Sequence, residues 1–176
     1  MIDPDDIDQE LEQHHRDAML NLILAWGSLD GALGMMLARV LGITMIEGAE
    51  IVAKMPASAR FAEMRRLMLR ASAGESVARM LKKHKKSYER HSQTRNFIAH
   101  SHCAGIWTKD RDYVVFATYE KVGPDELAVD AVPIQEMHKA TAWGGAMCKL
   151  ALAIADVPYA EETNTSNDVA PVPNEA

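Results

Sequence analysis

The sequence predicts an all-α protein, an up-down bundle of four to five helices with a β-hairpin inserted before the last helix. Apolar residues recur every three, four or seven positions over long stretches, which is the period of an amphipathic helix. Eleven methionines against 6% aromatic residues favour helices packed by Leu, Met and Ala. The 176 residues suit one domain, which we place at residues 1–157. An acidic, polar tail at residues 158–176 is expected to be disordered.

The first predicted helix is long. Pro4 and the aspartates around it suit a first helical turn, and Gly42 is typical of a C-terminal cap. Gly27, Gly31 and Gly34 lower helix propensity inside it, so we expect another helix to pack closely there. The apolar stripe runs through Ile7, Leu11, Ala18, Leu22, Ala25, Leu29, Leu33, Met36 and Val40.

Two further helices follow a connection that contains a short helical piece at residues 43–55. The second long helix is expected at about residues 58–71, with Phe61 and Met64 on its buried side. The third begins near residue 74 and continues to His100.

The pattern changes after the third helix. Tyr113–Tyr119 is rich in β-branched and aromatic residues and predicts a strand. Gly123–Glu126 has the composition of a turn, and Leu127–Val132 predicts a second strand, which gives a hairpin at about residues 106–132. Because a lone hairpin is unstable in water, it should pack on the bundle or on a partner. A last helix is expected at about Ile134–Ala155, and its inner face should carry Met137, Trp143, Met147, Leu150 and Ile154.

Charge and composition limit the classes of function. The net charge of -6 means that any binding of nucleic acid requires a local basic patch. The acidic N-terminus lacks the order of a signal peptide, and no window reads as an unbroken apolar membrane span. We therefore expect a cytoplasmic protein that does not bind membranes. Its two cysteines, Cys103 and Cys148, should be reduced.

One segment carries a specific chemical signal. Arg95-Asn96-Phe97-Ile98-Ala99-His100 ends the third helix and resembles the motif of the HEPN superfamily, an Arg and a polar residue followed by three residues and a His. The order of a long first helix, a long third helix, a β-rich excursion and a closing helix is also similar. The resemblance implies a helical bundle and a metal-independent ribonuclease. It further implies a composite site in a homodimer, with Arg95, Asn96 and His100 supplied by both chains.

These residue types suit RNA cleavage without a metal ion. A histidine can act as acid or base near neutral pH, and an arginine offers fixed donors to phosphate oxygens. On an ideal helix, however, Arg95 and His100 lie about 140° apart. Arg95 falls nearer the apolar stripe of Leu81 and Tyr88. The alternative is structural: Arg95 binds a backbone carbonyl or carboxylate inside the bundle, and His100 caps the helix.

Other polar residues on the third helix have two interpretations. The basic residues Lys82, Lys83, Lys85 and Lys86 form either a track for the RNA backbone or a solvated helix face. His84 and His91 lack the spacing of a zinc helix, and His14-His15 reads as a surface pair. We therefore expect no metal site and no cofactor.

The sequence leaves two main functions open, beside a metal or small-molecule site between the bundle helices, for which the third helix offers mainly Glu89 as a carboxylate. The first is a HEPN-like, metal-independent endoribonuclease that acts on single-stranded RNA as a homodimer, in a toxin–antitoxin or phage-defence role with an antitoxin as partner. The second is a non-catalytic helical module that dimerises or binds a protein or nucleic acid. The position of His100, buried inside one protomer or free at the surface, discriminates between them.

Overall fold

A computed structural model describes residues 2–52, 54–70, 74–121 and 127–155 of the chain. The predicted turn at residues 123–126 and the predicted tail at residues 158–176 lie outside these ranges.

Helices account for most of the described residues. The α-helices are α1 (Gln13–Leu41), α2 (Met45–Ile51), α3 (Ala57–Arg70), α4 (Gly74–His100) and α5 (Ile134–Ala155). The remaining elements are a 3-10 turn, η1 (Pro4–Asp6), and the strands β1 (Ile7–Asp8), β2 (His102–Trp107), β3 (Tyr113–Lys121) and β4 (Leu127–Pro133). The hairpin before the last helix fits the prediction, as β3 and β4. The all-α class is wrong, because the described residues also contain a four-stranded antiparallel sheet.

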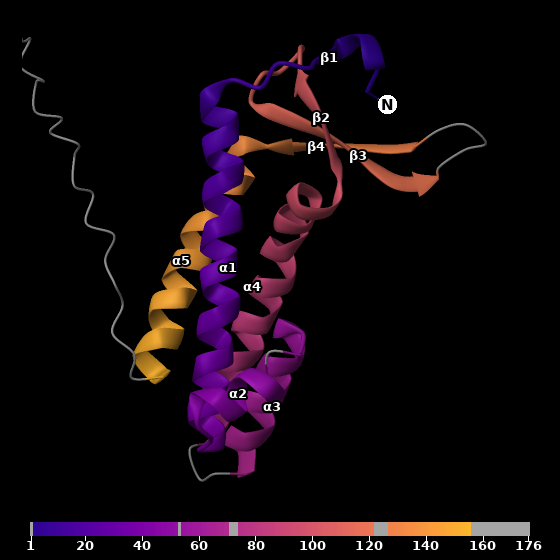
Figure 1. Cartoon of the computed structure of the whole chain (residues 1–176). Helices are drawn as coiled ribbons and strands as arrows, with labels where there is room; N and C mark the ends of the chain where they lie inside the picture. Colours follow the sequence, from indigo (N-terminus) through magenta and orange to yellow (C-terminus); the bar gives the residue numbers. More distant parts are fainter. Residues whose placement is uncertain (1, 53, 71–73, 122–126, 156–176) are drawn as a thin grey trace, which may run out of the picture.

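The sheet lies at one end of the bundle, beside the start of α1 and the end of α4, while α2 and α3 lie at the other end (Figure 1). Its strand order is β1-β2-β3-β4, and every neighbouring pair is antiparallel. Val114 and Phe116 of β3 are fully buried and join the core of the bundle. This packing provides the support that an isolated hairpin lacks in water.

The N-terminal segment departs from the predicted helix. Asp3 caps η1, since its carboxylate accepts a hydrogen bond from the Asp5 N–H at 3.1 Å. The chain then pairs Ile7 with Trp107 and Asp8 with Ile106, as a fourth strand. The acidic residues at the N-terminus therefore start a helical turn of only three residues, η1, and the long helix α1 begins at Gln13.

Helix ends follow local sequence closely. Gly42 has a positive φ of 69° and ends α1, as predicted, with its N–H directed to the carbonyls of Ala38 and Arg39. Thr44 and Glu47 form a capping box that starts α2: the Glu47 N–H donates to Thr44 Oγ1 at 3.2 Å, and the Thr44 N–H donates to Glu47 Oε2 at 2.8 Å.

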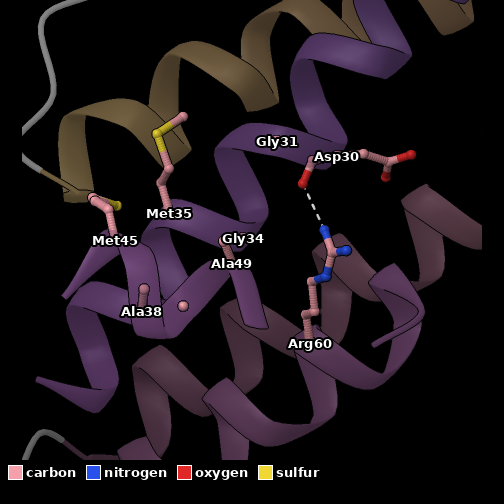
Figure 2. A pocket seen from close by; sticks show the side chains of 9 residues that line it. Asp30, Gly31, Gly34, Met35, Ala38, Met45, Ala49 and Arg60 are labelled. Atoms are coloured by element: carbon pink, nitrogen blue, oxygen red, sulfur yellow. Dashed lines mark hydrogen bonds between the residues drawn. The ribbon is translucent and has the colours of Figure 1, made fainter. Parts of the chain in front are cut away.

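Two of the three glycines in α1, Gly27 and Gly31, do not mark close helix packing among the described residues. A Cβ atom added at Gly27 or Gly31 would meet no atom within 4 Å, so the prediction is wrong there. Gly31 and Gly34 instead line a cavity of about 390 Å³ between α1, α2 and α3 (Figure 2). The Arg60 side chain reaches across one end of this cavity and donates a hydrogen bond to the Asp30 carbonyl at 2.5 Å.

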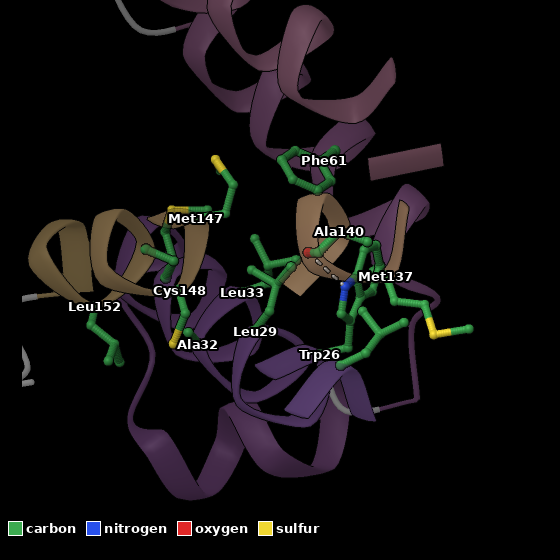
Figure 3. Close-up of a cluster of buried hydrophobic side chains, with 14 of the residues drawn as sticks. Trp26, Leu29, Ala32, Leu33, Phe61, Met137, Ala140, Met147, Cys148 and Leu152 are labelled. Atoms are coloured by element: carbon green, nitrogen blue, oxygen red, sulfur yellow. Dashed lines mark hydrogen bonds between the residues drawn. The ribbon is translucent and has the colours of Figure 1, made fainter. Parts of the chain in front are cut away.

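The core is built around α1. One face of this helix packs along α5, where Trp26 donates a hydrogen bond from Nε1 to the Ala140 carbonyl at 3.2 Å (Figure 3). Phe61 of α3 belongs to the same buried cluster and packs from a third helix. The inner face of α5 was predicted only in part, because Met137 and Met147 are buried whereas Leu150 and Ile154 are exposed.

The length and composition of α1 would also allow it to cross a membrane. The expectation that no window is apolar enough was therefore wrong by that criterion. In the most apolar 18-residue window of α1, 39% is buried inside the bundle. A core helix of a globular protein meets the same criterion, and the packing of α1 against α5 is of that kind.

Candidate functional site

The C-terminal end of α4 carries the three predicted catalytic residues. Asn96 and His100 are exposed and stand one turn apart, and Arg95 is half-buried. The side chain of His100 makes no hydrogen bond within the part of the chain that the structure describes. Its imidazole is therefore open to a ligand.

Arg95 reaches round the helix toward its neighbour. Its Nη1 donates a hydrogen bond to Asn96 Oδ1 at 3.2 Å. This contact joins the guanidinium to the side chain of Asn96. Within the described ranges Arg95 forms no ion pair with a carboxylate, so its positive charge is available to an anion.

The other neighbour of Arg95 is the half-buried Tyr88, two turns earlier on α4. The Tyr88 hydroxyl donates to Asp30 Oδ1 of α1 at 3.2 Å. Burial, and then the charge and hydrogen bond of Asp30, raise the pKa of Tyr88 to about 12, while the charges of Arg95 and Arg60 act in the opposite direction. Tyr88 thus connects α4, two turns before Arg95, to Asp30 of the core helix α1.

From the raised pKa of Tyr88 we predict that the protein loses stability in alkali. Its pKa in the folded protein is about 12, above the reference value of 10.0, so folding favours the protonated phenol. This contribution is complete below pH 10, and the free energy of unfolding should fall as the pH rises toward 12. Urea unfolding of the wild type and of Tyr88→Phe across that range should show the phenylalanine variant losing less stability. Parallel curves for the two proteins would contradict the assignment.

A shallow cavity adjoins the motif. It has a volume of about 420 Å³ and is lined by Gln93, Asn96, Phe97 and Ser101. Asn96 is the motif residue that contributes to its wall. The cavity offers an apolar surface from Phe97 and polar groups from the other three side chains, a combination that suits a base beside a phosphate.

The predicted RNA-binding lysines are split by the structure. Lys82, Lys83 and Lys86 are exposed, whereas Lys85 is half-buried and forms an ion pair with Glu89 at 3.2 Å. Lys82 and Lys86 lie within roughly 80° of Asn96 and His100 around the helix axis. One exposed face of α4 therefore carries Lys82, Lys86, Asn96 and His100, over a length of about 27 Å from residue 82 to residue 100.

Two arginines that sequence reasoning missed extend this basic surface. Arg65 of α3 and Arg79 of α4 join Lys82 around a cavity of about 240 Å³ between the two helices. In the sequence these residues are isolated charges, and only the packing of α3 against α4 brings the three side chains together. A cluster of two guanidinium groups and one ammonium group is suited to phosphate oxygens.

The remaining histidines and cysteines differ in environment. His91 lies against Trp143, with ring centroids 5.4 Å apart, and burial lowers the pKa of His91. Burial raises the pKa of both thiols, Cys103 and Cys148, which is consistent with unreactive packing residues. The interpretation of His14-His15 as a surface pair is wrong for His15, which is fully buried.

Comparisons with known proteins give no family for this chain. No family model matches it, and no curated protein or solved structure matches it significantly.

Proposed function

We propose that this protein is a HEPN-like, metal-independent endoribonuclease that cleaves single-stranded RNA as a homodimer. The observation that carries the proposal is the exposed His100 on the same helix face as Asn96, with the Arg95 guanidinium hydrogen-bonded to Asn96. The proposal includes a cytoplasmic toxin or defence role, with an antitoxin as protein partner.

The chemistry needs only the side chains of the motif. One His100 removes the proton from a ribose 2′-hydroxyl, and the 2′-oxygen attacks the adjacent phosphorus. The bond from phosphorus to the 5′-oxygen breaks, and the 5′-oxygen leaves as a hydroxyl after taking a proton from the second protomer's His100. Arg95 balances the negative charge on the phosphate oxygens, and the products are a 2′,3′-cyclic phosphate and a 5′-hydroxyl end.

The basic surface of α3 and α4 supports binding of the substrate. Arg65, Arg79 and Lys82 would hold phosphates at one end of α4, and Lys86 continues the same face toward Asn96. Because the chain is acidic overall, this local cluster is where electrostatic attraction of RNA is expected.

The outer face of α1 supports self-association. Leu20 and Leu24 are 57% and 58% exposed, and Gly27 and Gly31 continue the same face with open space beside them. Such a stripe of exposed leucines and small residues is suited to another helix. The same surface also favours the second candidate function, a non-catalytic module that dimerises or binds a protein.

Substitution of His100 separates the two functions. Purified wild-type protein should cleave single-stranded RNA in EDTA, and His100→Ala should lower the rate by roughly 10²–10⁴-fold. His138→Ala is the matched control, since His138 is an exposed histidine on α5, and it should cleave at the wild-type rate. Cleavage that persists in His100→Ala, or its absence in the wild type, would support the interaction module instead.

A mixing experiment tests the composite site. Wild-type protomers co-refolded with an excess of His100→Ala protomers should lose most of their activity, because each mixed dimer carries one His100 where the mechanism needs two. Light scattering of the wild type should give twice the mass of one chain. A monomer that cleaves RNA would exclude the composite site.

A further inference from the structure

A second cluster of chemically active side chains lies far along the chain from the motif, at the start of α1. Glu12, His14 and His15 each bring one ligand-type atom within 4.8 Å of the other two. Among the described residues, no other group of three His, Cys, Asp or Glu side chains meets this condition. The start of α1 lies beside the sheet, close to β1 (Figure 1).

His15 has the environment of a metal ligand. It is fully buried, and its Nε2 lies 2.8 Å from the Arg111 carbonyl oxygen. A carbonyl only accepts, so Nε2 carries the proton, and in the neutral ring Nδ1 keeps its lone pair. This Nδ1 is buried and finds no hydrogen-bond partner among the residues described. Metal-binding histidines are typically oriented in this way, by an N–H···O=C bond from the nitrogen that does not bind the ion.

Glu12 is held with one oxygen engaged and the other free to bind. Nε and Nη2 of Arg111 both donate to Glu12 Oε1, at 3.0 and 2.7 Å. Oε2 lies 3.4 Å from Nδ1 of His14.

The separation of these two atoms matches a tetrahedral site. Two ligands of a tetrahedral zinc ion with bonds of about 2.0–2.1 Å stand about 3.3 Å apart. Two imidazole nitrogens and one carboxylate oxygen form a ligand set that suits zinc and its neighbours in the transition series, whereas magnesium and calcium prefer oxygen alone. Glu12 and His14 are exposed, which leaves a fourth position for water.

We infer that Glu12 Oε2, His14 Nδ1 and His15 Nδ1 form a binding site for one divalent transition-metal ion of the zinc class. Glu12 and His15 both contact Arg111, which also binds Asp8 of β1 at 3.2 Å. An ion held by Glu12 and His15 would therefore stabilise the junction between the start of α1 and the sheet. The site is independent of the proposed ribonuclease, which needs no metal and uses the end of α4.

Calorimetric titration of the tag-free full chain with Zn²⁺ tests the inference. The wild type should bind one equivalent, and His14→Ala and Glu12→Gln should each weaken binding by more than about tenfold. Both positions are exposed, and in Glu12→Gln the amide oxygen of the new side chain can still accept from Arg111, so the fold should persist. His102→Ala, an exposed histidine outside the cluster, should bind as the wild type does.

A second measurement reports the geometry. Co²⁺ added in place of Zn²⁺ should give the intense visible absorption of a tetrahedral site, and the wild-type melting temperature should rise with Zn²⁺. Absence of binding, unchanged binding in His14→Ala, or loss of binding in His102→Ala would overturn the site. Binding that survives Glu12→Gln unchanged would reduce it to a histidine pair and would also overturn it.

Discussion

Replacing Trp26 by alanine should lower the free energy of unfolding by about 3–5 kcal/mol, the range for a large aromatic side chain removed from a packed core. Trp26 is 1% exposed and lies where α1, α4 and α5 meet. Its ring centroid is 4.9 Å from that of Tyr88 and 5.9 Å from that of Trp143. Alanine would leave a cavity between three helices, because the rings around it are held by other contacts. Urea unfolding followed by far-ultraviolet circular dichroism measures the loss.

Two further variants isolate the cause. Trp26→Phe keeps an aromatic ring but removes the Nε1–H donor to Ala140, and this hydrogen bond should account for about 1 kcal/mol of the change. Asn21→Ala lies on the same helix at an exposed position outside the leucine face, and should change stability by no more than about 0.5 kcal/mol. A loss in Trp26→Ala as small as that of Asn21→Ala would show that α1 is not the centre of the core.

Gly105→Ala should be the most damaging small change in the sheet. Gly105 has a φ of 141°, and an added Cβ would stand 2.1 Å from the Asp8 carbonyl oxygen. Backbone strain of this kind costs about 1–3 kcal/mol by itself, and the clash is with backbone that cannot rotate away. The edge strand β1 should therefore detach from β2, with loss of the Ile7–Trp107 and Asp8–Ile106 pairs.

Amide hydrogen exchange identifies this local failure. Protection of the Thr108 amide, which donates to the Asp6 carbonyl at 2.8 Å, should fall in Gly105→Ala before the helices unfold. Gly145→Ala is the control, since it adds a methyl group to the interior of α5 with open space around it. That change should raise stability by up to about 1 kcal/mol. Equal stability and equal β1 protection in Gly105→Ala and wild type would rule out the close approach.

The helices were predictable because their signals are local. Gly42 ends α1 as expected, and α4 and α5 end at the predicted His100 and Ala155. For the same reason, the apolar periodicity of α1 correctly predicted that Leu22, Leu29 and Leu33 are buried. Periodicity, however, cannot distinguish a buried apolar face from an exposed one, and Leu150 and Ile154 were misplaced on that account.

Two strands escaped prediction because they depend on distant partners. β1 has two residues, too few for any pattern, and exists because β2 offers it an edge. β2 contains Gly105 and a register shift between Cys103 and Gly105, which removes the alternation that marks a strand. The sheet thus appears only when residues as distant in the chain as Ile7 and Trp107 are brought together.

The candidate functional site also has features that local sequence predicts and features that only the fold decides. The sequence alone determined the motif Arg95, Asn96 and His100, the helix that carries it and the basic run before it, since all of these are set by spacing along one helix. Tertiary structure alone decided which way the residues face. It turned Arg95 to Asn96, left His100 exposed, and gathered Arg65 and Arg79 beside Lys82.

The N-terminal end of α1 is the clearest case of the difference. In the sequence, His15 is half of a polar pair at the start of a helix, and nothing nearby predicts its burial. Its hydrogen-bond partner is the carbonyl of Arg111, which is 96 residues away in the turn between β2 and β3. Local sequence determines which helices form and where they end, because those free energies arise within one turn. Burial and hydrogen-bond partners depend on what packs on each face, and that is decided only when the whole chain folds.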